Sequence, residues 1–178
     1  MAWTTPGTAV AGNVLTAAFW NSNVRDNSDA LYQSTKRIAY IQRTTEYTST
    51  ATAVASATDV FSSDLSWTAD GSSAYQIEFY CPFSYTGTIL DNSLSVYLVT
   101  GSGTSLGVIA VTGPAVVSTK RAYSPIFVKT FYTPAAGTAS INVRGVSSAG
   151  SDAGLVGGTA TSTERVAMYL AVYGPDIT

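Results

Sequence analysis

The sequence predicts an all-β protein, an antiparallel jelly-roll sandwich that follows an extended arm and one short α-helix. Three observations predict this fold class. From about residue 44 apolar residues recur with a period of two, turn-forming residues separate these runs at short intervals, and no helical period lies between them. We therefore expect residues 1–43 to form the arm and helix, and residues 44–178 to form the sandwich domain.

The arm and helix differ in composition from the rest of the chain. Residues 1–13 are expected to be extended, because Pro6 and two glycines interrupt any regular period. Thr16 is a suitable N-cap for a helix, and Leu15 and Trp20 are spaced as a hydrophobic staple around it. The apolar stripe continues through Val24 and Leu31, and polar side chains occupy much of the remaining surface. We expect the stripe to dock either on the chain's own β-domain or on another chain.

The strands are predicted from alternation. The clearest covers residues 75–83, where Ile77, Phe79 and Cys81 fall on one face and Gln76 and Glu78 on the other. Further strands are expected at residues 94–100, 108–112, 125–132, 139–146 and 166–173, with weaker candidates at 51–61 and 65–68. The glycine-rich segment 147–162 is predicted to be a long loop.

The last predicted strand is apolar or aromatic on both faces, since Met168 and Leu170 alternate with Tyr169 and Ala171. Such a strand is expected to be covered on both sides. A second protomer is one cover, and a loop or the N-terminal helix is the alternative. Tyrosine is favoured at interfaces, so we predict an oligomer interface built from outward-facing tyrosines. The candidates are Tyr80, Tyr97, Tyr132, Tyr169 and Tyr173.

Composition excludes several classes of function. The chain has no histidine and one cysteine, so no Ser-His-Asp or Cys-His arrangement, no His-ligated metal and no Cys-rich zinc site is expected. We predict no catalytic residues, no metal and no cofactor. A net charge of −2 gives no electrostatic footprint for nucleic acid. No apolar run approaches the roughly 20 residues of a membrane span, and the N-terminus lacks the pattern of a secretory signal.

The remaining candidate chemistry is weak. Residues 103–107 match the G-x-S-x-G string, but they lie between two predicted strands and no histidine is present to act as the base. Cys81 is predicted to be a small core residue. Glu78 is expected to be solvent-facing or paired with an arginine of an adjacent chain. Most of the other carboxylates are expected to form turns: Asp59, Asp64, Asp70, Asp91 and Asp152.

The N-terminal segment resembles the opening shared by many small structural proteins of tailed phages, particularly those of actinobacterial hosts. The resemblance rests on residues 3–6 (Trp-Thr-Thr-Pro), 14–17 (Val-Leu-Thr-Ala), 23–27 (Asn-Val-Arg-Asp-Asn) and 30–31 (Ala-Leu). It covers about the first 32 residues and implies a virion protein attached through this segment. The remainder is similar, more loosely, to the trimeric jelly rolls of the C1q and tumour-necrosis-factor type. The chain has no heptad stalk and no collagen-like repeat.

These observations lead to one expected function and several alternatives. We expect a non-enzymatic, homotrimeric capsid decoration or minor capsid protein, located in the virion and bound to the major capsid protein. The expected anchoring residues are Trp3, Pro6, Leu15, Phe19, Trp20, Val24 and Leu31. One alternative is a minor tail protein or receptor-binding tail tip that binds tail-tip proteins. A second is a carbohydrate-binding jelly roll in which Trp67 or exposed tyrosines stack on sugars, and a third is a polysaccharide-cleaving enzyme with a carboxylate pair.

Overall fold

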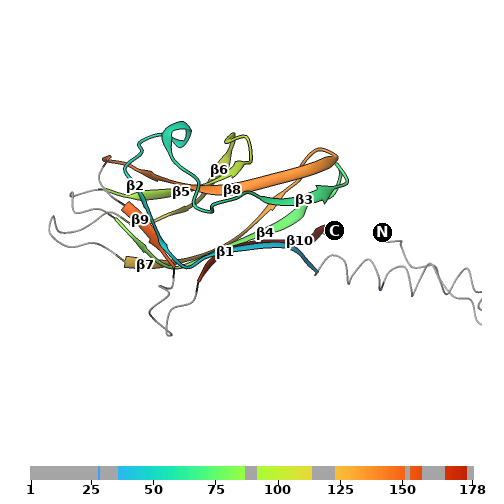
Figure 1. Ribbon diagram of the computed structural model, residues 1–178, viewed down its shortest axis with the longest axis horizontal. Coiled ribbons are helices and arrows are strands. Elements are labelled where there is room, and N and C mark those ends of the chain that lie inside the picture. The colour runs from blue at the N-terminus through green and yellow to red at the C-terminus, as the bar shows by residue number, and fades with distance from the viewer. Residues whose placement is uncertain are drawn as a thin grey trace, which may run out of the picture.

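The computed structural model describes residues 28, 36–86, 92–113, 123–150, 153–157 and 167–175. Within these residues the chain is an antiparallel β-sandwich of two layers (Figure 1), which confirms the predicted fold class. The strands are β1 (Arg37–Arg43), β2 (Glu46–Ser49), β3 (Leu65–Ala69), β4 (Tyr75–Tyr85), β5 (Leu94–Thr100), β6 (Ser105–Val111), β7 (Tyr123–Tyr132), β8 (Gly137–Ser147), β9 (Ala153–Val156) and β10 (Met168–Pro175). One 3-10 turn, η2 (Val54–Ser56), lies between β2 and β3.

Successive strands are distributed between the two sheets as in a jelly roll. The larger sheet has the order β1-β10-β4-β9-β2, and β7 also pairs with β4. The smaller sheet has the order β3-β8-β5-β6. Along one edge, β4 pairs with β10 in its first half and with β9 in its second. Along the other edge it pairs with β7, with a register shift between Cys81 and Ser84. β10 therefore lies between β1 and β4, with a neighbour on each side.

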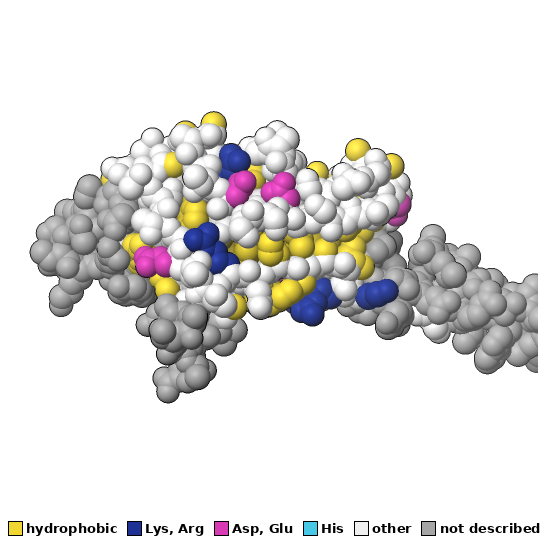
Figure 2. All heavy atoms as spheres, in the orientation of Figure 1, with side chains coloured by type: hydrophobic (Ala, Val, Ile, Leu, Met, Phe, Trp, Pro, Cys, Tyr) yellow, Lys and Arg dark blue, Asp and Glu magenta, His cyan; other side chains and the backbone are white. Residues whose placement is uncertain are grey.

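The core lies between the two sheets and follows the period-two pattern. Ile77, Phe79 and Cys81 of β4 face Leu94, Val96 and Leu98 of β5 across the layers, and each is at most 3% exposed. Burial of a side chain such as Phe79 contributes on the order of 2–3 kcal/mol. Trp67 is buried as well, at 6% exposed, and packs against the rings of Tyr75 and Tyr132. Figure 2 shows hydrophobic side chains as a band between the layers on one side of the molecule.

A buried polar residue, Asn142, and a glycine, Gly154, determine how neighbouring segments of the chain pack at this core. Asn142 on β8 is 1% exposed, and its amide accepts a hydrogen bond from the backbone of Phe61 and donates to the carbonyls of Phe61 and Ser63. It thereby satisfies buried backbone groups just before β3. Gly154 on β9 lies so close to Tyr47 and Tyr85 that a β-carbon there would stand 2.5 Å from the carbonyl oxygen of Tyr47 and 2.6 Å from Cε1 of Tyr85.

The structure corrects several predicted elements. Residues 51–61 form no strand; they contain η2 and an irregular stretch that places Val60 and Phe61 in the core. β9 lies inside the predicted loop 147–162, and its Leu155 is fully buried. β1 lies before residue 44, so the sandwich takes in residues 37–43, which we expected to belong to the arm and helix segment. The rest of that predicted segment lies outside the described residues, apart from Lys36 and from Ser28, which is helical and exposed.

Candidate interface on the outer face of the larger sheet

The larger sheet carries aromatic side chains on the face that points away from the core. On each strand they alternate with core residues, as Tyr169 does with Met168 and Leu170 on β10. We call this surface the aromatic face and define it by Tyr40 on β1, Tyr169 and Tyr173 on β10, Tyr80 on β4, and Phe127 and Phe131 on β7. It crosses four hydrogen-bonded strands in the order β1, β10, β4 and β7.

Four rings of the aromatic face, those of Tyr40, Tyr169, Tyr80 and Phe127, contact one another in a row across the sheet. The centroid distances are 5.7 Å between Tyr40 and Tyr169, 5.4 Å between Tyr169 and Tyr80, and 6.4 Å between Tyr80 and Phe127. These tilted and edge-on arrangements are the favoured geometries for aromatic pairs. Tyr40 and Phe127, at the two ends of this row, remain 40% and 57% exposed, and Phe131 on the same face is 56% exposed. The result is an ordered apolar surface that is open to solvent.

A carboxylate lies buried within this apolar surface. Glu78 of β4 is 7% exposed, and its Oε1 accepts a hydrogen bond of 2.5 Å from the phenol of Tyr169. Its Oε2 lies 3.3 Å from Nζ of Lys129 on β7. Burial, with the hydrogen bond to Glu78, raises the pKa of Tyr169 far above its ordinary value. The expectation that Glu78 faces solvent is therefore wrong, because side chains of two neighbouring strands cover it within one chain.

Cations lie at two margins of the aromatic face. The guanidinium of Arg37 stands 4.3 Å from the ring centroid of Tyr40, and Nζ of Lys129 stands 5.6 Å from that of Phe127. Both distances are in the range of cation–π attraction. The side chain of Lys129 is still 51% exposed although it pairs with Glu78. Positive charge on this surface therefore comes mainly from its edges.

The five predicted interface tyrosines do not share one surface. Tyr80, Tyr169 and Tyr173 lie on the aromatic face. Tyr97 lies on the other sheet, on the face opposite to the core residues Val96 and Leu98.

Tyr132 faces inward, which corrects its predicted outward position. It packs against the core, with its ring 6.4 Å from Trp67. In β7 both alternating sets of residues are mixed in character, so the sequence did not show which set faces the core. Phe127 and Phe131 were missed for this reason, and Tyr40 was missed because β1 was expected to belong to the arm and helix segment. The predicted anchoring residues all lie outside the described residues.

A second exposed apolar surface lies at the edge of the smaller sheet. Leu106, Val108 and Val111 on β6 are 38%, 49% and 61% exposed, and we call them the β6 strip. Within the described residues β6 pairs with β5 alone, so its other edge has unused backbone groups. Residues 92–113, which contain β5 and β6, include no charged side chain.

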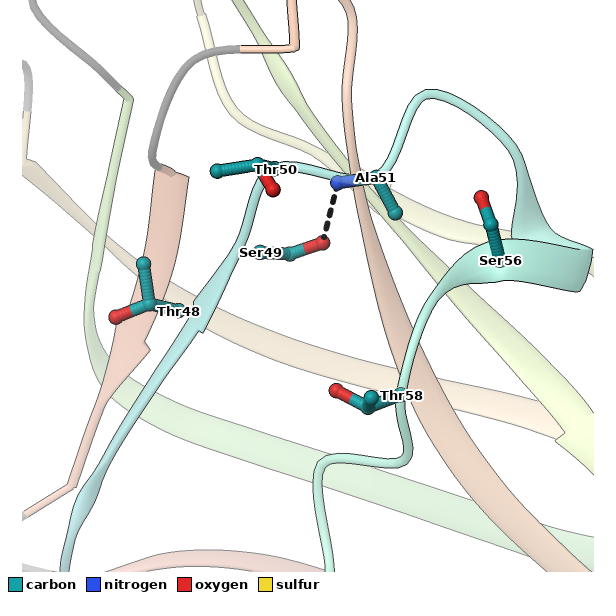
Figure 3. Close-up of a pocket in the computed structure, with 6 residues that line it drawn as sticks. All are labelled: Thr48, Ser49, Thr50, Ala51, Ser56 and Thr58. Atoms are coloured by element: carbon teal, nitrogen blue, oxygen red, sulfur yellow. Dashed lines mark hydrogen bonds between the residues drawn. The ribbon is translucent and has the colours of Figure 1, made fainter.

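The described part of the chain also has two shallow hollows. One has a volume of about 350 Å³ and is lined by Thr48, Ser49, Thr50, Ala51, Ser56 and Thr58 (Figure 3). Within it the hydroxyl of Ser49 accepts a hydrogen bond of 3.2 Å from the backbone N–H of Ala51. The other, of about 280 Å³, lies between the β5–β6 turn and the β7–β8 loop and has Tyr132 and several hydroxyls in its lining. Their side chains can offer hydrogen bonds, but their linings hold no carboxylate, amine or thiol.

The other candidate groups have structural partners. Asp70 forms a turn as predicted, since its carboxylate accepts hydrogen bonds from the backbone of Ser72 and Ser73. Asp59 instead pairs with Arg144 at 2.7 Å, and Asp64 accepts a hydrogen bond from the amide of Asn142. The Gly-Thr-Ser-Leu-Gly string at residues 103–107 spans the end of the β5–β6 turn and the start of β6, and no helix follows it.

The structure also bears on Cys81, on Trp67, and on metal and membrane binding. Cys81 is fully buried, as predicted. Trp67 is buried too, which removes it as a sugar-stacking residue. Among the described residues no three of His, Cys, Asp and Glu gather where they could hold a metal. The same residues include no helix that is long and apolar enough to cross a membrane.

Comparison with known proteins gives only distant structural likeness. Neither a protein-family model nor a curated protein matches the chain. Among solved structures, the chain is similar to the protein of T=1 particles derived from infectious bursal virus, with 15% sequence identity and a TM-score of 0.26. The match covers 78% of this chain and 36% of that one.

Proposed function

We propose that this protein is a non-enzymatic structural component of a virion, in which copies of the β-sandwich associate as a homotrimer through the aromatic face. The exposure of that face carries the proposal. Contiguous exposed apolar surface on a soluble domain marks a site of protein association. Here three large aromatic side chains are 40–57% exposed beside a row of contacting rings, and the chain as a whole has only 11% charged residues.

A second copy of the chain is the partner that fits this face. The β6 strip offers a complementary surface, because it is apolar, exposed and part of a segment without charge. The two surfaces belong to different sheets of the sandwich. A contact between different patches on identical copies is head-to-tail, and it closes into a ring when the rotation between copies allows. A ring of three copies would cover both surfaces of every copy.

The virion assignment rests on the N-terminal segment. The short motifs at residues 3–6, 14–17, 23–27 and 30–31 resemble the opening of small phage structural proteins. We propose that this segment attaches the trimer to the particle, with the aromatic side chains Trp3, Phe19 and Trp20 among the contacts. Three attachment segments on one trimer would act together through a high effective concentration. The proposed lattice partner is the major capsid protein, with a tail-tip protein as the alternative.

The test of self-association is the mass of the full-length chain in solution, measured by sedimentation and light scattering. A trimer is expected. Phe127→Asp should shift it to monomer, because Phe127 is 57% exposed and its replacement leaves the core intact. Thr68→Asp is the matched control, an exposed strand position on the smaller sheet, and it should remain trimeric. A wild-type chain that stays monomeric at micromolar concentration contradicts the proposed trimer.

The test of attachment uses the particle. Deletion of residues 1–34 should leave the association state unchanged and abolish incorporation into the particle. Incorporation of the truncated chain at the wild-type level would contradict the role of the segment. Location and copy number in the particle then separate the alternatives, because a copy number in the hundreds indicates the head and a small multiple of three indicates the tail.

A further inference from the structure

The Glu78–Lys129 pair is the polar feature of the aromatic face that association would affect most. The Glu78 side chain is only 9% exposed in the single chain, whereas the Lys129 side chain is 51% exposed. A second copy on this face would remove most of the remaining water from the ammonium group. A buried ion pair contributes little net stability, but loss of one member leaves an uncompensated charge and is costly.

We propose that Glu78 and Lys129 are the specificity-determining pair of the interface, which fixes how one copy is placed on the next. The inference rests on the proposed self-association through the aromatic face. Around the pair the surface is formed by aromatic rings, which tolerate sliding because dispersion contacts are not directional. The ammonium of Lys129 has three N–H groups, and one oxygen of Glu78 lies 3.3 Å from its Nζ. A neighbouring copy must therefore supply acceptors at one place on the face.

The β6 strip can supply such acceptors. As the edge of its sheet, β6 has backbone carbonyls that pair with no strand within the described residues. Carbonyl oxygens satisfy an ammonium group without adding a charge, which suits a segment that has none. A neighbour that is shifted or rotated would cover Lys129 with valine and leucine side chains instead. That arrangement is disfavoured, because a buried charge requires hydrogen-bond partners.

The experiment is a double-mutant cycle read by the dissociation constant of the trimer and by the distribution of sizes. Glu78→Gln keeps the shape of the side chain and leaves Lys129 without its carboxylate; Lys129→Met leaves the carboxylate without its cation. Each single change should weaken association on the order of 10- to 100-fold. The double variant should associate about as tightly as wild type, but as a mixture of sizes, because no charge then fixes the register.

Two controls separate a local effect from loss of the fold. Lys129→Arg retains the cation and should retain a single trimeric species. Asp70→Asn removes a carboxylate from the β3–β4 turn, away from the aromatic face, and should leave the dissociation constant unchanged. Circular dichroism and thermal unfolding show whether each variant is folded. Of the two single changes, Lys129→Met should disturb the fold less than Glu78→Gln, because the Lys129 side chain is half exposed.

The outcomes distinguish this inference from the proposed function. If the wild-type chain is a trimer and both folded single variants keep its dissociation constant, the pair lies outside the interface and the inference is overturned, while the proposed trimer stands. If the double variant forms one trimeric species identical to wild type, the pair does not set the register. A monomeric wild-type chain overturns the proposed function itself.

Discussion

Tyr169 and Glu78 lie diagonally across the β10–β4 pair, and the phenolic hydroxyl of Tyr169 donates a hydrogen bond of 2.5 Å to the Glu78 carboxylate. Directly across from Glu78 stands Ala171, which is fully buried although it points away from the core. The outer face of β10 is thus partly covered by side chains of its own chain. We predicted cover on both sides of this strand, and at Ala171 the outer side is fully covered.

Loss of this hydrogen bond should destabilise the fold. In Tyr169→Phe one carboxylate oxygen of Glu78, a residue that is 7% exposed, loses its hydrogen-bond donor. This loss should lower the free energy of unfolding by about 1–3 kcal/mol. Tyr173→Phe is the matched control, because Tyr173 shares the strand and face but makes no hydrogen bond within the described part of the chain; it should change the free energy of unfolding by less than about 0.5 kcal/mol. Urea unfolding measures both. Equal effects would show that the hydrogen bond to Glu78 adds nothing.

Tyr169 should ionise only at a strongly alkaline pH. Its folded-state pKa is raised by burial, by the hydrogen bond to Glu78 and by nearby charge, whereas an unfolded tyrosine titrates at about pH 10. The contribution to stability is therefore complete below about pH 10 and is lost as the pH rises further. In an alkaline titration followed by phenolate absorbance, Tyr169→Phe should lack one late-ionising group. An unchanged late phase would contradict this assignment.

The β3–β4 turn should lose stability in acid. Hydrogen bonds from the hydroxyl of Ser73 and from the backbone of Ser72 and Ser73 lower the pKa of Asp70 from 3.8 to about 2. A lowered folded-state pKa means that the stabilisation is complete above about pH 4 and is lost as the pH falls toward 2. Asp70→Asn cannot titrate, so its difference in melting temperature from wild type should shrink over this interval. A difference that is constant with pH would exclude the carboxylate as its source.

Close packing at β9 predicts a severe effect of a single methyl group. In Gly154→Ala the new β-carbon would stand 2.5 Å from the backbone oxygen of Tyr47, which cannot move without disturbing the β2–β9 pairing. Overpacking of this kind costs about 1–3 kcal/mol or more. Gly113→Ala is the control, because no atom lies within 4 Å of the position of its β-carbon. Thermal unfolding compares them, and similar melting temperatures would contradict the packing described for β9.

The thiol of Cys81 should be unreactive in the folded protein. The residue is fully buried, and burial raises its pKa from 9.0 to about 11. Since the thiolate is the reactive form, a thiol reagent at neutral pH should label Cys81 only when the chain unfolds. Labelling followed against urea concentration should therefore coincide with the unfolding transition. Rapid labelling in the absence of urea would mean that the β4 region opens locally.

The sequence predicted the elements that have a regular alternation or clear turns. β4 and β5 were found because polar and apolar residues alternate over the first part of each strand, and Asp70 because Asp followed by Gly is typical of a turn. β9 was missed because it is four residues long and contains the glycine that its packing requires. Residues 51–61 were a strand candidate because their apolar side chains are spaced as in a strand. The stretch is irregular instead, and the backbone of Phe61 forms hydrogen bonds with the side-chain amide of Asn142.

The candidate site was only partly predictable, because the aromatic face forms only when strands that are distant in the sequence pair with one another. Tyr80 and Tyr169 were identified from their own strands, but their contact depends on β10 lying beside β4. The burial of Glu78 depends on Lys129 and Tyr169, which come from strands far along the chain. No pattern within β4 alone indicates that such neighbours will cover a glutamate.

The position of β10 has a consequence for biosynthesis. The strand inserts between β1 and β4, so a nascent chain that has emerged only as far as β9 would leave the larger sheet with a gap one strand wide. Two strand edges would then be open at once, each with free backbone groups. Folding of this domain should therefore be completed only after the last strand has left the ribosome, and chains that terminate early should be directed to proteolysis or insoluble deposits.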